Sequence, residues 1–131
     1  MITINKKRIL SIISIVLVLI TAVICTPVES KAASWHMTQL VSKKVSGESN
    51  FKKTWKTPLS GKNWTFSYGF NTLAVNEDCV TGKHNTKWHK SQIVKGGKNY
   101  NATAEKGVYG NREVKHTHST VNYKYYSMVW K

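Results

Sequence analysis

Aromatic side chains alternate with small or polar ones in the stretch NWTFSYGFNTL, which spans residues 63–73. Four rings occupy every second position, namely Trp64, Phe66, Tyr68 and Phe70. In an extended strand, side chains two residues apart point to the same face, so the four rings share one face. The opposite face carries Thr65, Ser67, Gly69 and Asn71 and is expected to contact solvent. The pattern predicts a strand over residues 64–75.

This aromatic stripe has two interpretations. It is either the core of a small β domain or an exposed surface that binds a partner. Each ring can bury on the order of 150–250 Å² of surface. Once a leader of 32 residues is removed, Cys79 is the only cysteine, so no internal disulfide can replace that packing. We therefore expect the stripe to lie in the core.

Further runs of β-forming residues predict additional strands, over residues 35–45, 51–56, 87–94, 99–106, 113–119 and 120–130. Turn residues separate these runs, and KGGK at 95–98 is typical of a hairpin turn. The segment Asn76–Asn85 is predicted to be a loop, in which Glu77 and Asp78 form an ordinary solvated pair. This organisation predicts an all-β fold, a small antiparallel β-sandwich formed by residues 61–131, with residues 33–60 as an N-terminal extension.

The first 32 residues have the layout of a secretory signal peptide. A basic stretch at 6–8 precedes an uncharged apolar run at 9–25, and Ser30 and Ala32 place small residues before a cleavage point. The alternative is a retained membrane anchor, for which the apolar run is slightly short. We expect a signal helix that is cleaved after Ala32, and a mature protein of residues 33–131 that is secreted.

Lysine dominates the charge of the mature chain. The whole sequence has 20 Lys plus Arg and 6 Asp plus Glu; cleavage leaves 16 basic and 5 acidic residues, a net charge of +11 with neutral histidines. Arg112 is the only arginine after residue 32, which favours diffuse attraction over bidentate anion binding. Such a charge attracts polyanions, although it would also serve solubility alone. Because the chain is exported, we expect an anionic envelope component and peripheral contact with a bacterial membrane surface, not nucleic acid.

No catalytic residue, metal ligand set or cofactor is predicted. Cys79 has no nucleophile signature around it and is expected to be a small buried hydrophobe. A disulfide between two Cys79 thiols would instead produce a homodimer. His116 and His118 are two residues apart, but neither a carboxylate nor a cysteine follows at a metal-binding spacing. We interpret them as a surface pair.

If the stripe is buried, a recognition surface must use lysines and the outward-facing rings of other strands. Aromatic rings interleaved with lysines are suited to an envelope surface, where phosphates and sugars occur together. The candidate surface comprises Lys83, Lys87, Trp88, Lys90, Lys95, Lys98, Lys124, Tyr126 and Trp130.

The part of the chain from Gly61 to Met128 resembles the lactococcin 972 family of secreted bacteriocins. The resemblance lies in the order and spacing of four segments: GKNWTFSYGFNT (61–72), KHNTKWHKSQIVKGGK (83–98), ATAEKGVYG (102–110) and STVNYKYYSM (119–128). These are similar to the family's glycine–tryptophan opening, its histidine-containing strand with a glycine turn, its alanine–glycine stretch and its closing tyrosine-rich strand.

The resemblance implies an antiparallel β-sandwich that is secreted and is not an enzyme. It also implies killing of related Gram-positive cells by interference with septum and wall synthesis through the precursor lipid II. The alternative is a non-toxic secreted module that binds the wall or a carbohydrate.

Overall fold

Eight β-strands form two antiparallel four-stranded sheets in the computed structural model, which describes residues 33–131. The strands are β1 (Trp35–Ser46), β2 (Trp55–Gly61), β3 (Trp64–Asn71), β4 (Glu77–His84), β5 (Trp88–Lys95), β6 (Lys98–Ala104), β7 (Gly110–Lys115) and β8 (Thr120–Trp130). A single 3₁₀ turn, η1 (Glu48–Phe51), follows β1. The all-β prediction is confirmed for this part of the chain, whereas the predicted signal helix lies outside the described residues.

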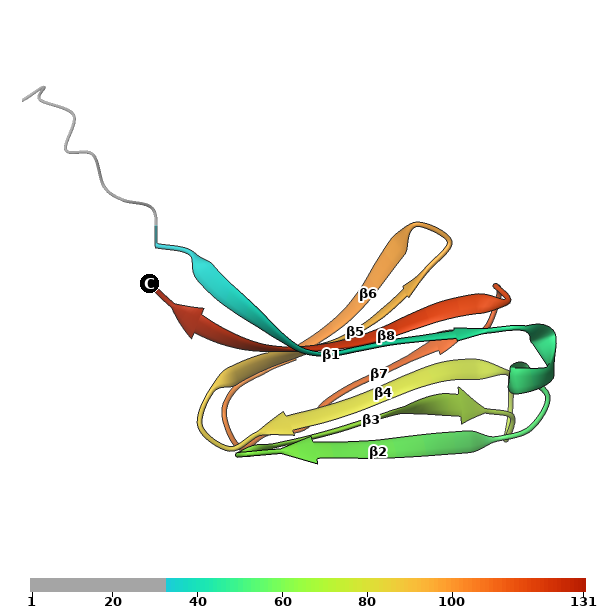
Figure 1. Cartoon of the computed structure of the whole chain (residues 1–131), viewed down its shortest axis with the longest axis horizontal. Helices are drawn as coiled ribbons and strands as arrows, with labels where there is room; N and C mark the ends of the chain where they lie inside the picture. The colour runs from blue at the N-terminus through green and yellow to red at the C-terminus, as the bar shows by residue number, and fades with distance from the viewer. Residues whose placement is uncertain (1–32) are drawn as a thin grey trace, which may run out of the picture. The chain divides into compact units, whose positions relative to one another are not determined.

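The two sheets share the chain almost equally (Figure 1). Sheet A has the strand order β1-β8-β5-β6, and sheet B has the order β2-β3-β4-β7. The chain passes from sheet A to sheet B after β1, returns after β4, crosses again after β6 and ends in β8. These crossings place strands from both halves of residues 33–131 in each sheet, so neither half contains all the strands of one sheet.

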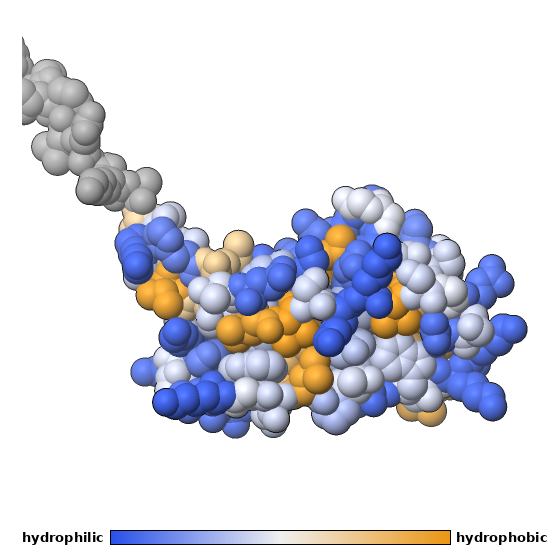
Figure 2. Space-filling model, viewed as in Figure 1, coloured by the Kyte–Doolittle hydropathy of each residue, from blue (hydrophilic) through white to orange (hydrophobic). Residues whose placement is uncertain are grey.

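Aromatic side chains from the two sheets meet in the space between them. The ring of Phe66 on β3 stacks on that of Tyr125 on β8, with centroids 5.0 Å apart, and Tyr68 lies 5.1 Å from Tyr123. The buried core consists of Val41, Phe51, Phe66, Phe70, Val80, Ile93, Val121, Tyr123 and Tyr125. Figure 2 shows hydrophobic surface mainly along the middle of the domain, with hydrophilic side chains projecting around it.

The aromatic stripe is the part of β3 that faces this core, as predicted. Phe66 and Phe70 are 2% and 1% exposed, and Trp64 and Tyr68 are half-buried and pack against the core cluster. The opposite face is less solvated than expected, because Ser67 and Gly69 are buried while Thr65 is exposed. Gly69 faces the main chain of Trp55 so closely that a Cβ would collide with its carbonyl oxygen.

Residues 33–60 are an integral part of the sandwich and not a separate extension. β1 pairs with β8 along nearly its whole length, and β2 forms an edge of sheet B by pairing with β3. Pro58 lies inside β2, where a proline is tolerated because an edge strand leaves alternate N–H groups without partners. The turn η1 connects β1 to β2 and buries Phe51 in the core.

The predicted loop over Asn76–Asn85 is wrong, since most of it is β4, a central strand of sheet B. Its inward positions are Asp78, Val80, Gly82 and His84, of which only Val80 is a typical core residue. The KGGK turn is confirmed: Gly96 and Gly97 have φ of 53° and 71°, the left-handed values that a tight hairpin requires. Among residues 33–131, no helix has the length and hydrophobicity needed to cross a bilayer.

Replacing Phe66 by alanine tests the assignment of the stripe to the core. The change removes a ring that stacks between the sheets, so we expect the free energy of unfolding to fall by about 3–5 kcal/mol. The measurement is urea denaturation of residues 33–131 followed by tyrosine and tryptophan fluorescence. Thr65→Ala, next to it but exposed, should cost less than about 1 kcal/mol; equal losses for the two variants would contradict the assignment.

Candidate functional site

The strand register determines which predicted surface residues lie together. In β8, Val121, Tyr123, Tyr125 and Ser127 are buried against sheet B, so the alternate positions face outward. Lys124, Tyr126 and Trp130 occupy these outward positions. In β5, Trp88 pairs with Met128 and Lys90 pairs with Tyr126, which places both side chains on the same outer face. Five of the nine predicted residues thus share the outer face of sheet A: Trp88, Lys90, Lys124, Tyr126 and Trp130.

Three tryptophans cluster at one end of this face. Trp35, at the start of β1, pairs in register with Trp130, at the end of β8. The ring of Trp35 lies 4.9 Å from that of Trp130 and 5.5 Å from that of Trp88. Trp35, Trp88 and Trp130 are 38%, 42% and 55% exposed, so the cluster is accessible to solvent. Met128 lies in the same row as Trp88 but is buried.

Next to the tryptophans on this face, the ring of Tyr126 is in contact with a lysine. The ammonium of Lys90 lies 4.7 Å from the centre of this ring, which is a cation–π contact. The Tyr126 hydroxyl donates to Oε1 of Gln92 at 3.4 Å. Burial first, and then the positive charge of Lys124, lower the pKa of the Lys90 ammonium. A pair of like charges of this kind would be stabilised by an anion placed between them.

The two sheets differ sharply in charge. The strands of sheet A contain six lysines and neither aspartate nor glutamate: Lys43, Lys44, Lys90, Lys95, Lys98 and Lys124. The strands of sheet B contain four basic and three acidic residues: Lys56, Lys83, Arg112 and Lys115, and Glu77, Asp78 and Glu113. The register places Lys44, Lys90 and Lys124 on the outer face of sheet A with the tryptophan cluster, and no carboxylate of a sheet A strand lies beside them.

Three other predicted residues lie apart from this face. Lys83 is on the outer side of β4, in sheet B, with its ammonium 5.2 Å from the ring centre of Tyr109. Lys87 is exposed and directly precedes Trp88 in the connection between β4 and β5. Lys98 is exposed at the start of the edge strand β6. Of these, Lys87 adjoins the tryptophan cluster in the chain, and Lys83 belongs to a different surface.

Lys95 was predicted to lie on the candidate surface, and this prediction is wrong because its side chain is buried. Its side chain is 1% exposed and its ammonium donates to Oδ2 of Asp78 at 2.7 Å and to the main-chain carbonyl of Lys115. Asp78, predicted to be solvated, is fully buried. A charge of either sign is expensive to bury alone, so each of these side chains requires the other.

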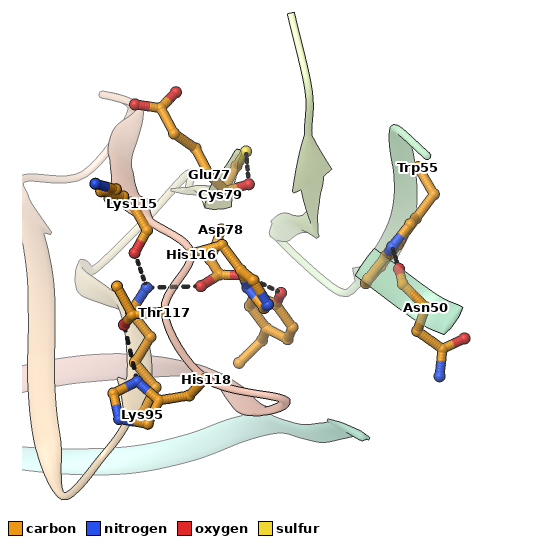
Figure 3. A network of polar contacts seen from close by, with 11 residues as sticks. Asn50, Trp55, Glu77, Asp78, Cys79, Lys95, Lys115, His116, Thr117 and His118 are labelled. Carbon is orange, nitrogen blue, oxygen red and sulfur yellow. Dashed lines mark hydrogen bonds and ion pairs between the residues drawn. The ribbon is translucent and has the colours of Figure 1, made fainter. Parts of the chain in front are cut away.

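Asp78 is the centre of a wider polar network that joins both sheets (Figure 3). Nδ1 of His116 donates to Oδ1 of Asp78 at 2.8 Å, and the hydroxyl of Tyr123 donates to the same oxygen at 3.3 Å. Burial, followed by the negative charge of Asp78, raises the pKa of the Tyr123 hydroxyl. The His116 ring also packs on Phe51, with centroids 4.1 Å apart. The network connects the two sheets inside the domain, and few of its atoms are accessible to solvent.

The histidines do not form a metal centre within the described residues. Across 33–131, no three side chains of His, Cys, Asp or Glu converge as ligands. His116 is held by Asp78, while Nδ1 of His118 hydrogen-bonds the neighbouring Thr117 hydroxyl. His89 is fully buried, with Nε2 at 3.1 Å from the carbonyl oxygen of Gly82. His118 is exposed, but the His116 side chain is 15% exposed and bonded to Asp78, so the interpretation as a surface pair is wrong for His116. Both residues follow β7 and lie outside the strands, although a strand was predicted over 113–119.

Sequence reasoning missed Trp35 as a member of the tryptophan cluster. Its strand was predicted, but its partner across the sheet lies 95 positions later in the chain, at the opposite terminus. The sequence signal for this pairing is a tryptophan near each end of residues 33–131, in two predicted strands that an antiparallel sheet can bring together.

The Lys95–Asp78 pair is tested by Lys95→Met, which keeps the length of the side chain but removes its charge. The change leaves the buried carboxylate of Asp78 without its main counter-ion, so we expect a loss of about 3–5 kcal/mol in the free energy of unfolding. Lys98→Met, at the exposed position opposite in the hairpin, should change it by less than about 0.5 kcal/mol. The double change Lys95→Met with Asp78→Asn should cost less than the sum of the single losses; additive losses would contradict direct pairing.

Cys79 provides a test of the local electrostatics on sheet B. Burial first, and then the charges of Glu113, Glu77 and Asp78, raise the pKa of this thiol to about 11. Since the thiolate is the reactive form, alkylation by iodoacetamide should accelerate with pH around a midpoint near 11 in the folded protein. The urea-unfolded chain, whose thiol should titrate near about 8.5, is the control. Mass spectrometry gives both rates, and a folded midpoint at or below that of the unfolded chain would contradict this description.

Comparison of the chain with protein-family models, with curated proteins and with solved structures gave no match.

Proposed function

We propose that the mature chain is a secreted cationic bacteriocin that acts on the Gram-positive cell envelope through the outer face of sheet A. The observation that carries this proposal is the segregation of charge: the strands of sheet A contain no carboxylate, and Lys44, Lys90 and Lys124 share its outer face. An envelope rich in phosphate groups would attract this sheet in preference to the other.

The side chains of the face suit a ligand that is both anionic and partly apolar. Lys90 and Lys124 supply positive charge around the ring of Tyr126, and the tryptophans supply aromatic surface next to them. Lysine ammonium groups bind phosphates as point charges, while aromatic rings stack on sugars or lie among headgroups. A wall precursor such as lipid II offers pyrophosphate, sugars and a lipid in one molecule, and the resemblance of residues 61–128 to the lactococcin 972 family supports the same target.

The test is growth inhibition of Gram-positive strains by purified residues 33–131, at increasing salt and with or without added lipid II. We expect inhibition that is relieved by lipid II and weakened as salt shortens the screening length from about 10 Å at 0.1 M to about 3 Å at 1 M. The double variant Lys90→Gln with Lys124→Gln should bind anionic envelope preparations on the order of 30-fold more weakly, at about 1 kcal/mol per lysine.

The matched control is Lys52→Gln with Lys53→Gln, which makes the same change in net charge at exposed positions next to η1. It should retain most of the affinity, because these lysines lie outside the strands of sheet A. Equal weakening by both pairs would show that net charge alone matters and would contradict the assignment to one face. Binding to sacculi without inhibition of any strain would favour the alternative, a non-toxic wall- or carbohydrate-binding module.

A further inference from the structure

The projecting end of the β1–β8 ribbon carries exposed apolar side chains, most of them on its outer face. The start of β1 and the end of β8 extend beyond sheet B and bend away from it (Figure 1). Main-chain hydrogen bonds continue past both strands, since Ser34 and Lys131 exchange bonds of 2.9 and 3.1 Å. The ribbon therefore stays paired to its tip. We define the ribbon end as Trp35, Met37, Trp88, Val129 and Trp130.

The register assigns these side chains to two faces. Trp35, Met37 and Trp130 lie on the outer face with Trp88, because Trp35 pairs with Trp130, and both Met37 and Trp88 pair with Met128. Val129 pairs with His36 and so points to the opposite face. All five side chains of the ribbon end are at least 38% exposed. The four exposed apolar side chains of the outer face are poorly suited to contact with water.

From this geometry we infer that the ribbon end inserts into the headgroup layer of an anionic lipid bilayer and anchors the domain there. The inference deepens the proposed function by naming the partner of one part of the face. Tryptophan concentrates at membrane–water interfaces, because the indole ring is apolar but its N–H prefers a polar neighbour. Three of the five tryptophans of the chain are at this end.

The arrangement of the rings argues against a sugar platform. The Trp35 ring is inclined by 49° to that of Trp88 and by 68° to that of Trp130, so the three faces do not form one plane. A flat stack on consecutive sugar rings needs coplanar aromatic faces. The exposed thioether of Met37 and the exposed branch of Val129 also offer no hydrogen bond to a sugar hydroxyl.

Positive charge surrounds the ribbon end and selects anionic lipid. Lys131 follows Trp130, and Lys87 precedes Trp88, and both lysines are exposed. Lys90 and Lys124 lie on the same outer face, farther from the tip of the ribbon along β5 and β8. Apolar side chains flanked by lysines match a surface whose headgroups carry negative charge above an apolar interior.

The experiment uses vesicles of phosphatidylglycerol and, separately, of phosphatidylcholine, with the intact residues 33–131. On phosphatidylglycerol we expect a blue shift of tryptophan emission and quenching by lipids brominated at shallow positions of the chains. On phosphatidylcholine we expect binding at least tenfold weaker. No blue shift, or quenching only by soluble acrylamide at the level of the free protein, would overturn the inference.

Variants locate the contact. Trp88→Ala with Trp130→Ala should weaken binding to phosphatidylglycerol vesicles at least tenfold. Leu73→Ala with Val75→Ala, which removes two exposed apolar side chains from the connection between β3 and β4, should leave it within about twofold. Circular dichroism and the melting temperature establish that each variant is folded, and the brominated-lipid measurement on the unmodified protein decides the matter if a variant does not fold.

The outcomes separate this inference from the proposed function. Growth inhibition relieved by lipid II, without any vesicle binding, would overturn the anchor and leave the proposed function standing. Vesicle insertion through the tryptophans, without inhibition of any strain, would support the anchor and contradict the bacteriocin. Quenching of the tryptophans by soluble wall fragments in the absence of lipid, with no vesicle binding, would replace the bilayer by a glycan.

Discussion

The buried carboxylate of Asp78 fixes the arrangement on which the candidate face depends. It binds Lys95 of β5, Tyr123 of β8 and His116 between β7 and β8, and so joins both sheets. Because side chains alternate along a strand, an inward Lys95 requires an outward Trp88 and Lys90. An inward Tyr123 likewise requires an outward Lys124 and Tyr126. A register shift of one residue in β5 or β8 would turn the lysines of the outer face inward. It would also leave the carboxylate of Asp78 without its hydrogen-bond partners.

The same network explains how a domain with so much positive charge can keep one sheet free of carboxylates. Lys95 is the one lysine of sheet A that is buried, and its counter-ion comes from sheet B across the core. The remaining lysines of sheet A are at least partly exposed to water, where charge costs little. No aspartate or glutamate is therefore needed in the strands of sheet A to neutralise a buried lysine.

The strands that could be predicted are those in which apolar and polar side chains alternate. Prediction failed where a polar side chain points inward because a residue of another strand neutralises it or packs against it. β8 was located correctly at 120–130, and the start of β3 was located correctly at Trp64, but β3 ends at Asn71 and not at residue 75. β4 was taken for a loop because its inward positions are Asp78, Val80, Gly82 and His84: the aspartate is neutralised by Lys95, and Gly82 leaves room for Tyr125 and Ser91. Lys95 was placed on the surface for the same reason, since its counter-ion lies 17 residues earlier in another sheet. The division of charge between sheets could not be predicted, because it depends on the strand order and not on the local sequence.

In the envelope binding proposed above, the lysines on the outer face of sheet A and the apolar side chains of the ribbon end would act over different distances, and therefore one after the other. At moderate salt, electrostatic attraction acts over a screening length of about 10 Å, so the exposed lysines of sheet A would orient the domain before contact. The apolar contacts of Trp35, Trp88 and Trp130 are effective only when water is excluded between the surfaces, so they follow. The lysines should therefore set mainly the rate of association, and the tryptophans mainly the rate of dissociation. The network around Asp78 keeps the two groups on one rigid surface, so that the orientation produced by the first presents the second to the bilayer.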